Sequence, residues 1–188
     1  MRETGKHTFF SFFPFLTLCF AKFQFAPGKR AFKITGRMNA DWIKPKGFHF
    51  FDLADSTAIF VVCPQKTFVM QTEVGTGERL QRAETGKRAD RPQTHELLAD
   101  ICKALGARVA GVALTDVKDG VYFSAISLDM KNELGEKFVE LDARPSDALA
   151  LAFSCHAPVL VSRNLLQKCK DASELLEKFR RRDPSVFS

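Results

Sequence analysis

The sequence lacks the paired cysteines that a CxxC metal or redox motif would need. Its five cysteines, at positions 19, 63, 102, 155 and 169, are an odd number, and four of them lie inside apolar segments. A thiol in such a segment behaves as a small hydrophobic side chain. The pattern argues against a structural zinc site and indicates a reducing compartment, so we expect a cytoplasmic location.

The chain also lacks net charge over most of its length, although the whole sequence carries +6. Seven Lys and Arg residues stand against one acid before Met38, whereas the remainder has 21 of each sign. A basic surface attracts phosphates through counterion release. Because the excess charge belongs to the first 37 residues, any attraction for nucleic acid in the rest of the chain must come from local patches.

Residues 1–38 form a basic extension that holds nine of the 19 phenylalanines. The run Thr8 to Ala21 resembles the core of a signal peptide, but it is short and is interrupted by Pro14. Such a run is not expected to span a membrane. Two readings stay open: the extension is a targeting segment, or Met38 is the true start and the extension is not translated.

The remaining length suits one domain with a sizeable core. We expect an irregular entry over 39–57, followed by buried strands at Ala58 to Cys63 and Lys66 to Glu73 and a short exposed helix within 75–90. A hairpin is predicted where Asp119-Gly120 joins two strand-like runs, with a third strand at Lys137 to Leu141. Strands, hairpins and helices together predict a single α+β domain with a mixed sheet and packed helices.

Two helices have clear sequence signals. Thr94 can cap a helix that ends at Gly106 and carries the apolar residues of one face: Leu97, Leu98, Ile101, Cys102 and Leu105. Pro145 can begin a second helix, whose run Ala148 to Phe153 is apolar on all sides and must therefore be buried. Ser162 and Asp171 are expected to cap two further helices near the C-terminus.

An ordered set of motifs carries a family resemblance. It comprises RPQTHELL at 91–98, Asp119-Gly120 opening a strand, DARPSDALA at 142–150, and Ala157-Pro158. The set is similar to the bifunctional nuclease domain family, also called domain of unknown function 151, over residues 58–170, with a C-terminal helix and basic tail at 171–188. The resemblance implies an α+β domain that assembles into homo-oligomers and acts on both RNA and DNA. One departure is that Gln71 to Lys87 is more polar than the family pattern.

The two long motifs supply residues suited to phosphodiester hydrolysis. Cleavage needs an activated water and stabilisation of the charged transition state, which carboxylate-held metal ions often provide. We take His95, Asp142 and Asp147 as candidate catalytic residues, with Asp142 and Asp147 as possible ligands of Mg²⁺ or Mn²⁺. Arg91 and Arg144 could bind substrate phosphates.

Each of these residues also has a structural explanation. Asp147 can simply stabilise a helix N-terminus, His95 can be a hydrogen-bonded anchor, and Asp142 and Arg144 can belong to an ion network. The sequence contains neither an HNH nor an HExxH motif. The leading hypothesis is a metal-assisted nuclease, and the alternative is a non-catalytic module that binds a ligand, a protein or nucleic acid through the same arginines and acids.

Overall fold

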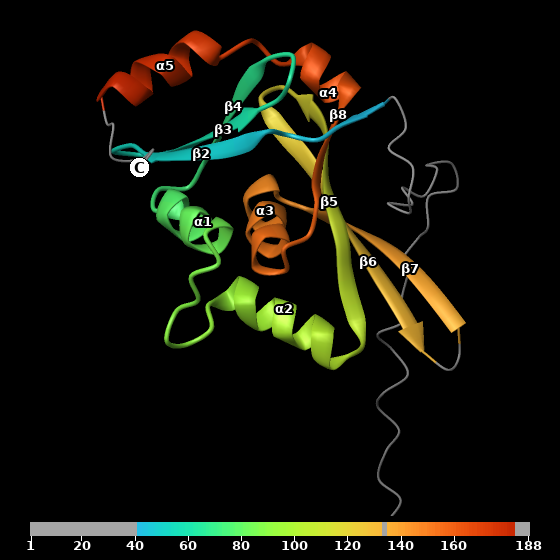
Figure 1. Ribbon diagram of the computed structural model, residues 1–188. Helices are drawn as coiled ribbons and strands as arrows, with labels where there is room; N and C mark the ends of the chain where they lie inside the picture. The colour runs from blue at the N-terminus through green and yellow to red at the C-terminus, as the bar shows by residue number, and fades with distance from the viewer. Residues whose placement is uncertain (1–40, 133–134, 183–188) are drawn as a thin grey trace, which may run out of the picture. The chain divides into compact units, whose positions relative to one another are not determined.

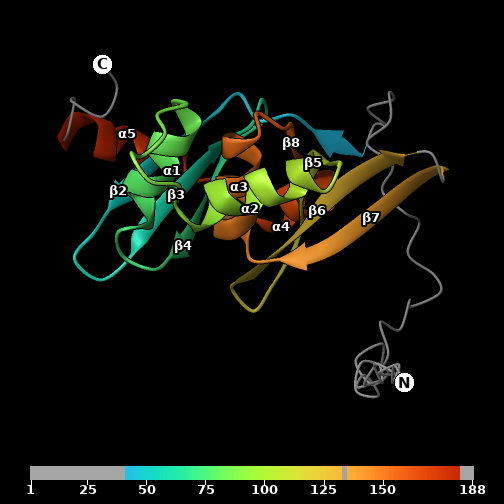
Figure 2. The same ribbon diagram turned by 90° about the horizontal axis from the view of Figure 1, so that it is seen from below.

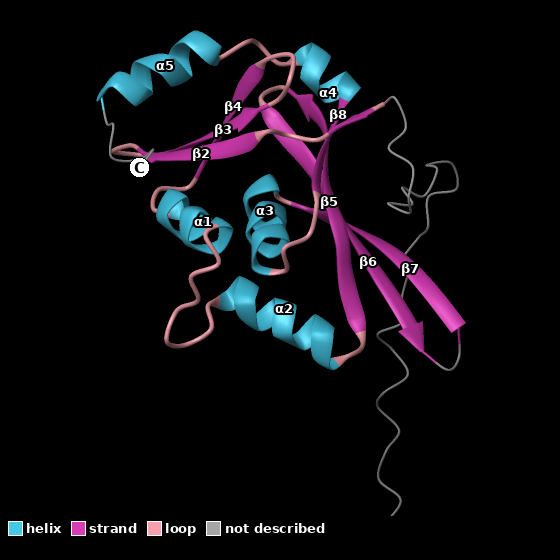
Figure 3. Cartoon of the chain, in the orientation of Figure 1, coloured by secondary structure: helices cyan, strands magenta, loops and turns pink. Residues whose placement is uncertain are grey.

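A computed structural model describes residues 41–132 and 135–182, which contain two β-sheets and five helices. The expected α+β domain with a mixed sheet is confirmed (Figures 1 and 3). The extension at 1–38 lies outside the described residues. The strands are β1 (Trp42–Ile43), β2 (Gly47–Asp52), β3 (Thr57–Val62), β4 (Thr67–Thr72), β5 (Ala107–Lys118), β6 (Val121–Asn132), β7 (Gly135–Ala143) and β8 (Val159–Ser162). The helices are α1 (Thr76–Glu84), α2 (Thr94–Ala104), α3 (Pro145–Ser154), α4 (Arg163–Lys168) and α5 (Ser173–Arg182).

The larger sheet has the strand order β1-β8-β5-β6-β7. Only β5 and β8 pair in parallel, and the other neighbours are antiparallel. The predicted hairpin is present as β5 and β6, and its turn residues Asp119 and Gly120 both have positive φ, at 50° and 80°. That backbone geometry matches the twist of paired strands and favours an Asp-Gly dipeptide. The local turn signal therefore set the register of the longest strand pair.

Helix α3 lies at the centre of the domain. Its six residues from Ala148 to Phe153 are all buried, as the sequence predicted. Pro145 is the first helical residue and the helix packs against α1, α2, β5 and β6. Because α3 is enclosed, its N-terminal turn is held in a fixed position relative to both neighbouring helices.

The smaller sheet, β2-β3-β4, is covered by aromatic side chains on both faces. Phe48 and Phe50 meet the ring of Phe153 on α3, with centroid distances of 5.2 and 6.1 Å. On the other face, Phe51 packs against Phe179 of α5, and Figure 2 shows this sheet beside α1 and α3. The range 39–57 therefore contains two strands where an irregular entry was expected. Burial in β2 does not alternate, since Phe50 and Phe51 are both buried, so the segment carries no period-two signal of a strand.

Helix α1 is attached to the smaller sheet through Asp52. The carboxylate of Asp52 accepts hydrogen bonds from the backbone N–H groups of Gly77 (3.1 Å) and Glu78 (3.2 Å) and from the hydroxyl of Thr57. A Cβ atom added to Gly77 would lie 2.9 Å from Asp52 Oδ1, so a larger residue there would displace the carboxylate that holds α1. The predicted helix within 75–90 is confirmed, but Leu80 is fully buried, so the helix is not wholly exposed.

Helix α2 differs from its prediction in two ways. Gln93, rather than Thr94, is the N-cap. The backbone N–H of Gln93 donates a hydrogen bond to the carboxylate of Glu96 at 2.8 Å. The apolar face expected to pack inward is largely open to solvent, since Leu97 is 51 %, Ile101 45 % and Leu105 70 % exposed. Periodicity identified this face correctly but could not show what covers it. Among the described helices, none is long and apolar enough to cross a membrane.

Candidate functional site

A cavity of about 480 Å³ lies where α1, α2 and the N-terminal turn of α3 converge. Residues from both family motifs line it, together with basic side chains of the segment that precedes the first motif. The lining includes Glu73, Arg79, Arg82, Lys87, His95, Glu96, Arg144 and Asp147. The cavity therefore collects charged groups from parts of the chain that are far apart in sequence.

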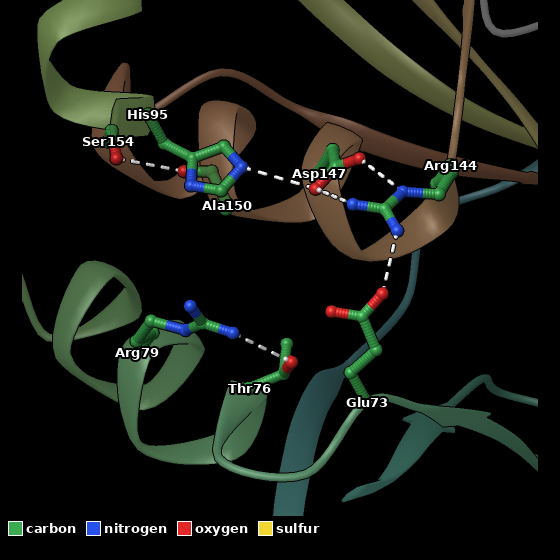
Figure 4. Close-up of polar contacts among 8 residues, drawn as sticks. All are labelled: Glu73, Thr76, Arg79, His95, Arg144, Asp147, Ala150 and Ser154. Carbon is green, nitrogen blue, oxygen red and sulfur yellow. Dashed lines mark hydrogen bonds and ion pairs between the residues drawn. The ribbon is translucent and has the colours of Figure 1, made fainter. Parts of the chain in front are cut away.

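Arg144 makes the central ion pairs of the cavity (Figure 4). Its Nε and one terminal nitrogen donate to the two carboxylate oxygens of Asp147 at 2.7 and 3.3 Å, and the other terminal nitrogen donates to Glu73 at 2.9 Å. A guanidinium has five N–H groups, so these bonds leave two available. The side chains of Arg144 and Glu73 are 67 % and 71 % exposed. Such an exposed pair contributes little stability and can yield to an incoming anion.

His95 approaches the same carboxylate from α2. Its Nε2 lies 3.3 Å from Oδ1 of Asp147, and Figure 4 shows the imidazole ring and the guanidinium of Arg144 on opposite sides of Asp147. Both side chains of this pair are partly exposed, at 30 % for His95 and 36 % for Asp147. A carboxylate that binds one ring nitrogen fixes the orientation of the imidazole, as in many sites where a histidine carries a proton.

The contacts of Asp147 determine its charge. Burial alone would raise the pKa of Asp147, but hydrogen bonds from Arg144 and His95 outweigh burial and lower it below its ordinary value. The pKa of Arg144 is raised, chiefly by its hydrogen bonds to Asp147. At neutral pH the pair is therefore an ionised carboxylate beside an ionised guanidinium. An ionised Asp147 accepts the Nε2 proton of His95 and leaves Nδ1 as the unprotonated nitrogen of the neutral ring.

Helix α1 adds positive charge on the opposite wall. Arg79 donates to the Thr76 hydroxyl at 3.1 Å, and Arg82 pairs with Glu78 at 2.9 Å. Lys87 follows the helix and also lines the cavity. The N-terminus of α1 is already occupied by the Asp52 carboxylate, so the phosphate-attracting groups of this helix are its side chains rather than its first amides.

Two of the candidate residues lie outside the cavity. Asp142 is an exposed residue of β7 that is paired with Ala125, whereas its neighbours Leu141 and Ala143 pack against the core. Since side chains alternate across a strand, Asp142 points to the face opposite α3. Arg91 is exposed in the turn before α2 and does not line the cavity. The structure thus brings together His95, Arg144 and Asp147 and leaves Asp142 and Arg91 apart.

The carboxylates do not fit the metal site expected from the sequence. Asp142 and Asp147 lie on different sides of the larger sheet, and both oxygens of Asp147 already accept hydrogen bonds. Within residues 41–132 and 135–182, no group of three or more His, Cys, Asp and Glu side chains is arranged to hold a metal ion. The arrangement is instead a carboxylate held between a guanidinium and an imidazole.

Three charged residues of the cavity lie outside the two sequence motifs: Glu73, Arg79 and Arg82. Glu73 follows β4, and no local pattern marks it, because its role depends on a partner 71 positions away. The two arginines of α1 are three residues apart, so a helix over this segment places Arg79 and Arg82 on one face. What was not recognisable is that this face meets α3.

A known protein family matches the part of the chain that forms this cavity. A sequence model of the bifunctional nuclease domain matches residues 68–174, which is more than half of the chain. The matched range includes β4 to β8, all three helices that form the cavity, and the whole of its charged lining.

Individual relatives are distant. An uncharacterised protein of Mycobacterium tuberculosis is 30% identical over 81 residues, covering 43% of this chain and 45% of its own length. Bifunctional nuclease 1 of Oryza sativa subsp. japonica is 32% identical over 79 residues, covering 42% of this chain and 23% of its own. Bifunctional nuclease 1 of Arabidopsis thaliana is 27% identical over 133 residues, covering 64% and 38%. The chain spans less than half the length of each of these relatives.

Proposed function

Because this chain belongs to the bifunctional nuclease domain family, we propose that it is a nuclease that hydrolyses phosphodiester bonds in RNA and DNA. The observation that carries the proposal is the His95–Asp147–Arg144 arrangement inside a cavity lined by further basic side chains. Relatives of this chain are named bifunctional nucleases. We propose for this chain the nuclease activity that the names of those relatives state.

In the proposed reaction, Arg144 receives a substrate phosphate. The exposed ion pair with Glu73 opens, and the freed N–H groups bind two phosphate oxygens in bidentate fashion. Arg79 faces the same space from α1 (Figure 4) and adds a second positive charge. Fixed donors aimed at a phosphate stabilise the charge that develops when a nucleophile attacks phosphorus.

His95 acts as the general base. Asp147 holds the Nε2 proton, so Nδ1 of the neutral imidazole can accept a proton from the attacking water. Asp147 positions the ring and stabilises the imidazolium that forms, and does not contact the substrate. As the water oxygen bonds to phosphorus, the bond from phosphorus to the leaving sugar oxygen breaks, and that oxygen takes a proton from solvent. Because Asp142 lies outside the cavity, no step of this reaction is assigned to it or to a metal ion. The dependence on Mg²⁺ or Mn²⁺ expected from the sequence stays a prediction for the assay.

The decisive experiment uses labelled single-stranded RNA and DNA with the full chain, in the presence of Mg²⁺, Mn²⁺ or a chelator. We expect cleavage by the unmodified protein, strong loss in His95→Ala and Arg144→Ala, and little change in Asp142→Asn. Cleavage that survives both of the first two substitutions would show that the cavity is not the active site. Loss in Asp142→Asn with retained binding would restore the metal hypothesis.

A non-catalytic binding module is the second candidate. It is favoured by the lack of a metal-ligand cluster in the described part of the chain and by the anion-receptor character of Arg144. Such a module would bind single-stranded nucleic acid without cleaving it, under every metal condition. Binding would still be lost in Arg144→Ala, whereas His95→Ala would leave it nearly unchanged, and this difference separates the two candidates.

We also propose that the chain assembles into homo-oligomers through α2. Leu97, Ile101 and Leu105 form an exposed apolar stripe along this helix, and such a stripe is stabilised when a second copy covers it. A cytoplasmic location completes the proposal. It is supported by the free thiols of the described cysteines: Cys63, Cys102, Cys155 and Cys169.

A further inference from the structure

We propose that the groove between α2 and the C-terminal end of α3 binds the continuation of a single nucleic-acid strand whose scissile phosphate lies at Arg144. The inference rests on the proposed nuclease function and extends it, because it makes the substrate a strand of several nucleotides rather than a mononucleotide. It is carried by two further cavities that join the one already described, and by the charges along them.

The three cavities share their walls. The first and a small one of about 90 Å³ have Ala83, Lys87, Glu96 and Ser154 in common. The small cavity and a third, of about 580 Å³, share Arg88, Ser154 and His156. Ser154, at the end of α3, lines all three. The three cavities therefore adjoin one another in a row from the ion pairs of Arg144 to the beginning of β5.

Helix α2 borders this row of cavities along its whole length. The first cavity is lined by the N-cap Gln93 and by Thr94, His95, Glu96 and Leu98, and the third by Ala99, Asp100, Cys102 and Lys103. Lys103 lies two turns beyond His95, about 12 Å along the helix axis. A single phosphate cannot bridge that distance, whereas successive phosphates of one strand can.

The far part of the groove is basic. Arg88, Lys103 and Arg108 line the third cavity, and Asp100 is the acid among its lining residues. Arg88 pairs with Asp100 at 2.9 Å, with side chains 60 % and 46 % exposed, and Arg108 pairs with Asp129 at 2.8 Å. Pairs as exposed as these contribute little stability and can exchange for phosphate. No acid pairs with Lys103 among the described residues, so its charge is directly available.

His156 marks the junction of the small and third cavities. It is exposed and has a φ of 51°, in the left-handed region that non-glycine residues seldom occupy. Its imidazole lies against Gly86, since a Cβ built on that glycine would be 3.7 Å from His156 Cε1. The strained turn thus projects a flat aromatic ring into the path, and rings of this kind provide stacking surfaces for bases.

The experiment measures how affinity depends on strand length. Phosphorothioate single-stranded DNA resists cleavage and is used as a dinucleotide and at about 4, 8 and 16 nucleotides. For the full chain we expect the Kd to fall with length and then level off. Lys103→Glu should raise the Kd of the eight-nucleotide strand roughly three- to tenfold and reduce its salt dependence by about one unit of log-log slope. The dinucleotide Kd should stay within about twofold.

Two further substitutions test the proposal: one should change the Kd in the opposite direction, and the other is a control that should not change it. Asp100→Asn removes the negative charge of the same cavity and should lower the Kd of the eight-nucleotide strand about two- to threefold. Lys137→Glu makes the same change as Lys103→Glu at an exposed site on β7 that lines none of the three cavities, and should leave every Kd unchanged. Unaltered thermal unfolding of each variant confirms that the fold is intact.

Four results would overturn the proposal. One is an affinity of the unmodified chain that is independent of length, and another is a Lys103→Glu effect that is equal for the dinucleotide and the longer strands. The third is no effect of Lys103→Glu at any length while Arg144→Ala abolishes binding, which would reject the groove and leave the proposed function standing. If the unmodified chain binds none of the strands, both the groove and the proposed function fail.

Discussion

Nε2 of His95 lies 3.3 Å from Oδ1 of Asp147, so the first turn of α2 is tied to the first turn of α3. The two residues are 52 positions apart and belong to the two sequence motifs that carry the family resemblance. Their contact gives those motifs a shared physical role, because one fixes the orientation of an imidazole that the other supplies. The same carboxylate also holds Arg144, so a single side chain positions both of the other two groups.

Replacing His95 by Ala should lower the rate of phosphodiester cleavage by about 10²- to 10⁴-fold, the range typical of a lost general base. The partly exposed position of His95 means that the free energy of unfolding should change little. Asp147→Asn should lower the rate less than His95→Ala, since the base remains but loses its orientation. Rates measured under single-turnover conditions test both variants. A rate within twofold of the unmodified protein in His95→Ala would exclude this histidine as the base.

Arg144→Lys should weaken substrate binding roughly tenfold although the charge is kept, because lysine cannot present the planar pair of donors. Asp147 would also lose its bidentate partner. The matched control is Arg181→Lys on α5, an exposed arginine outside the cavity, which should bind as the unmodified protein does. Fluorescence anisotropy with a short single strand measures both. Equal affinities in Arg144→Lys and the unmodified chain would mean that Arg144 acts through charge alone.

Asp52→Ala should lower the free energy of unfolding by about 1 kcal/mol, a typical value for a lost helix cap, kept modest by the exposure of this carboxylate. Burial alone would raise the pKa of Asp52, but hydrogen bonds from Thr57 and from the amides of α1 lower it overall. A carboxylate whose pKa is lowered by folding contributes stability above its ordinary pKa of 3.8 and loses that contribution as the pH falls through the lowered value. Denaturant titrations at neutral pH and below pH 3.8 should therefore show a smaller difference between variant and parent in acid. A difference that grows in acid would contradict this role.

Ile101→Lys should disperse homo-oligomers without unfolding the chain, because it places a charge in the middle of the exposed stripe of α2 and leaves the core intact. Sedimentation velocity over a range of concentrations measures the oligomeric state. Val121→Lys, at a residue 59 % exposed at the start of β6, is the control for adding a lysine to an apolar surface position. Identical sedimentation of Ile101→Lys and the parent would place any oligomer contact elsewhere.

The elements that local sequence governs were predictable. Asp119-Gly120 specified its turn through the backbone conformations that these residues tolerate, and the unbroken apolar run in α3 required burial on every side. The sequence predicts strands over Arg108 to Thr115 and Val121 to Asp129, and β5 and β6 extend beyond these runs because cross-strand pairing, rather than residue preference, sets their length. The cap of α2 was misplaced by one residue, since Gln93 is an unusual cap and its partner Glu96 satisfies its backbone amide.

The site residues that lie within the two sequence motifs were predictable. His95, Arg144 and Asp147 were named from their motifs, and the structure brings them together. Asp142 was chosen for its closeness to Asp147 along the chain, but strand alternation turns it to the other face. Glu73 was missed because it is far from Arg144 along the chain and comes close to it only in the folded protein.

The attachment of α1 by Asp52 divides the site between two supports. Arg79 and Arg82 lie on α1, which the Asp52 carboxylate holds to the smaller sheet and which also packs against α3, whereas His95 and Asp147 belong to helices packed on the larger sheet. The ion pair between Glu73, which follows the last strand of the smaller sheet, and Arg144, the N-cap of α3, joins the two supports at 2.9 Å. The Arg144 guanidinium is therefore the point at which the segment that follows the smaller sheet is joined to a helix that rests on the larger one.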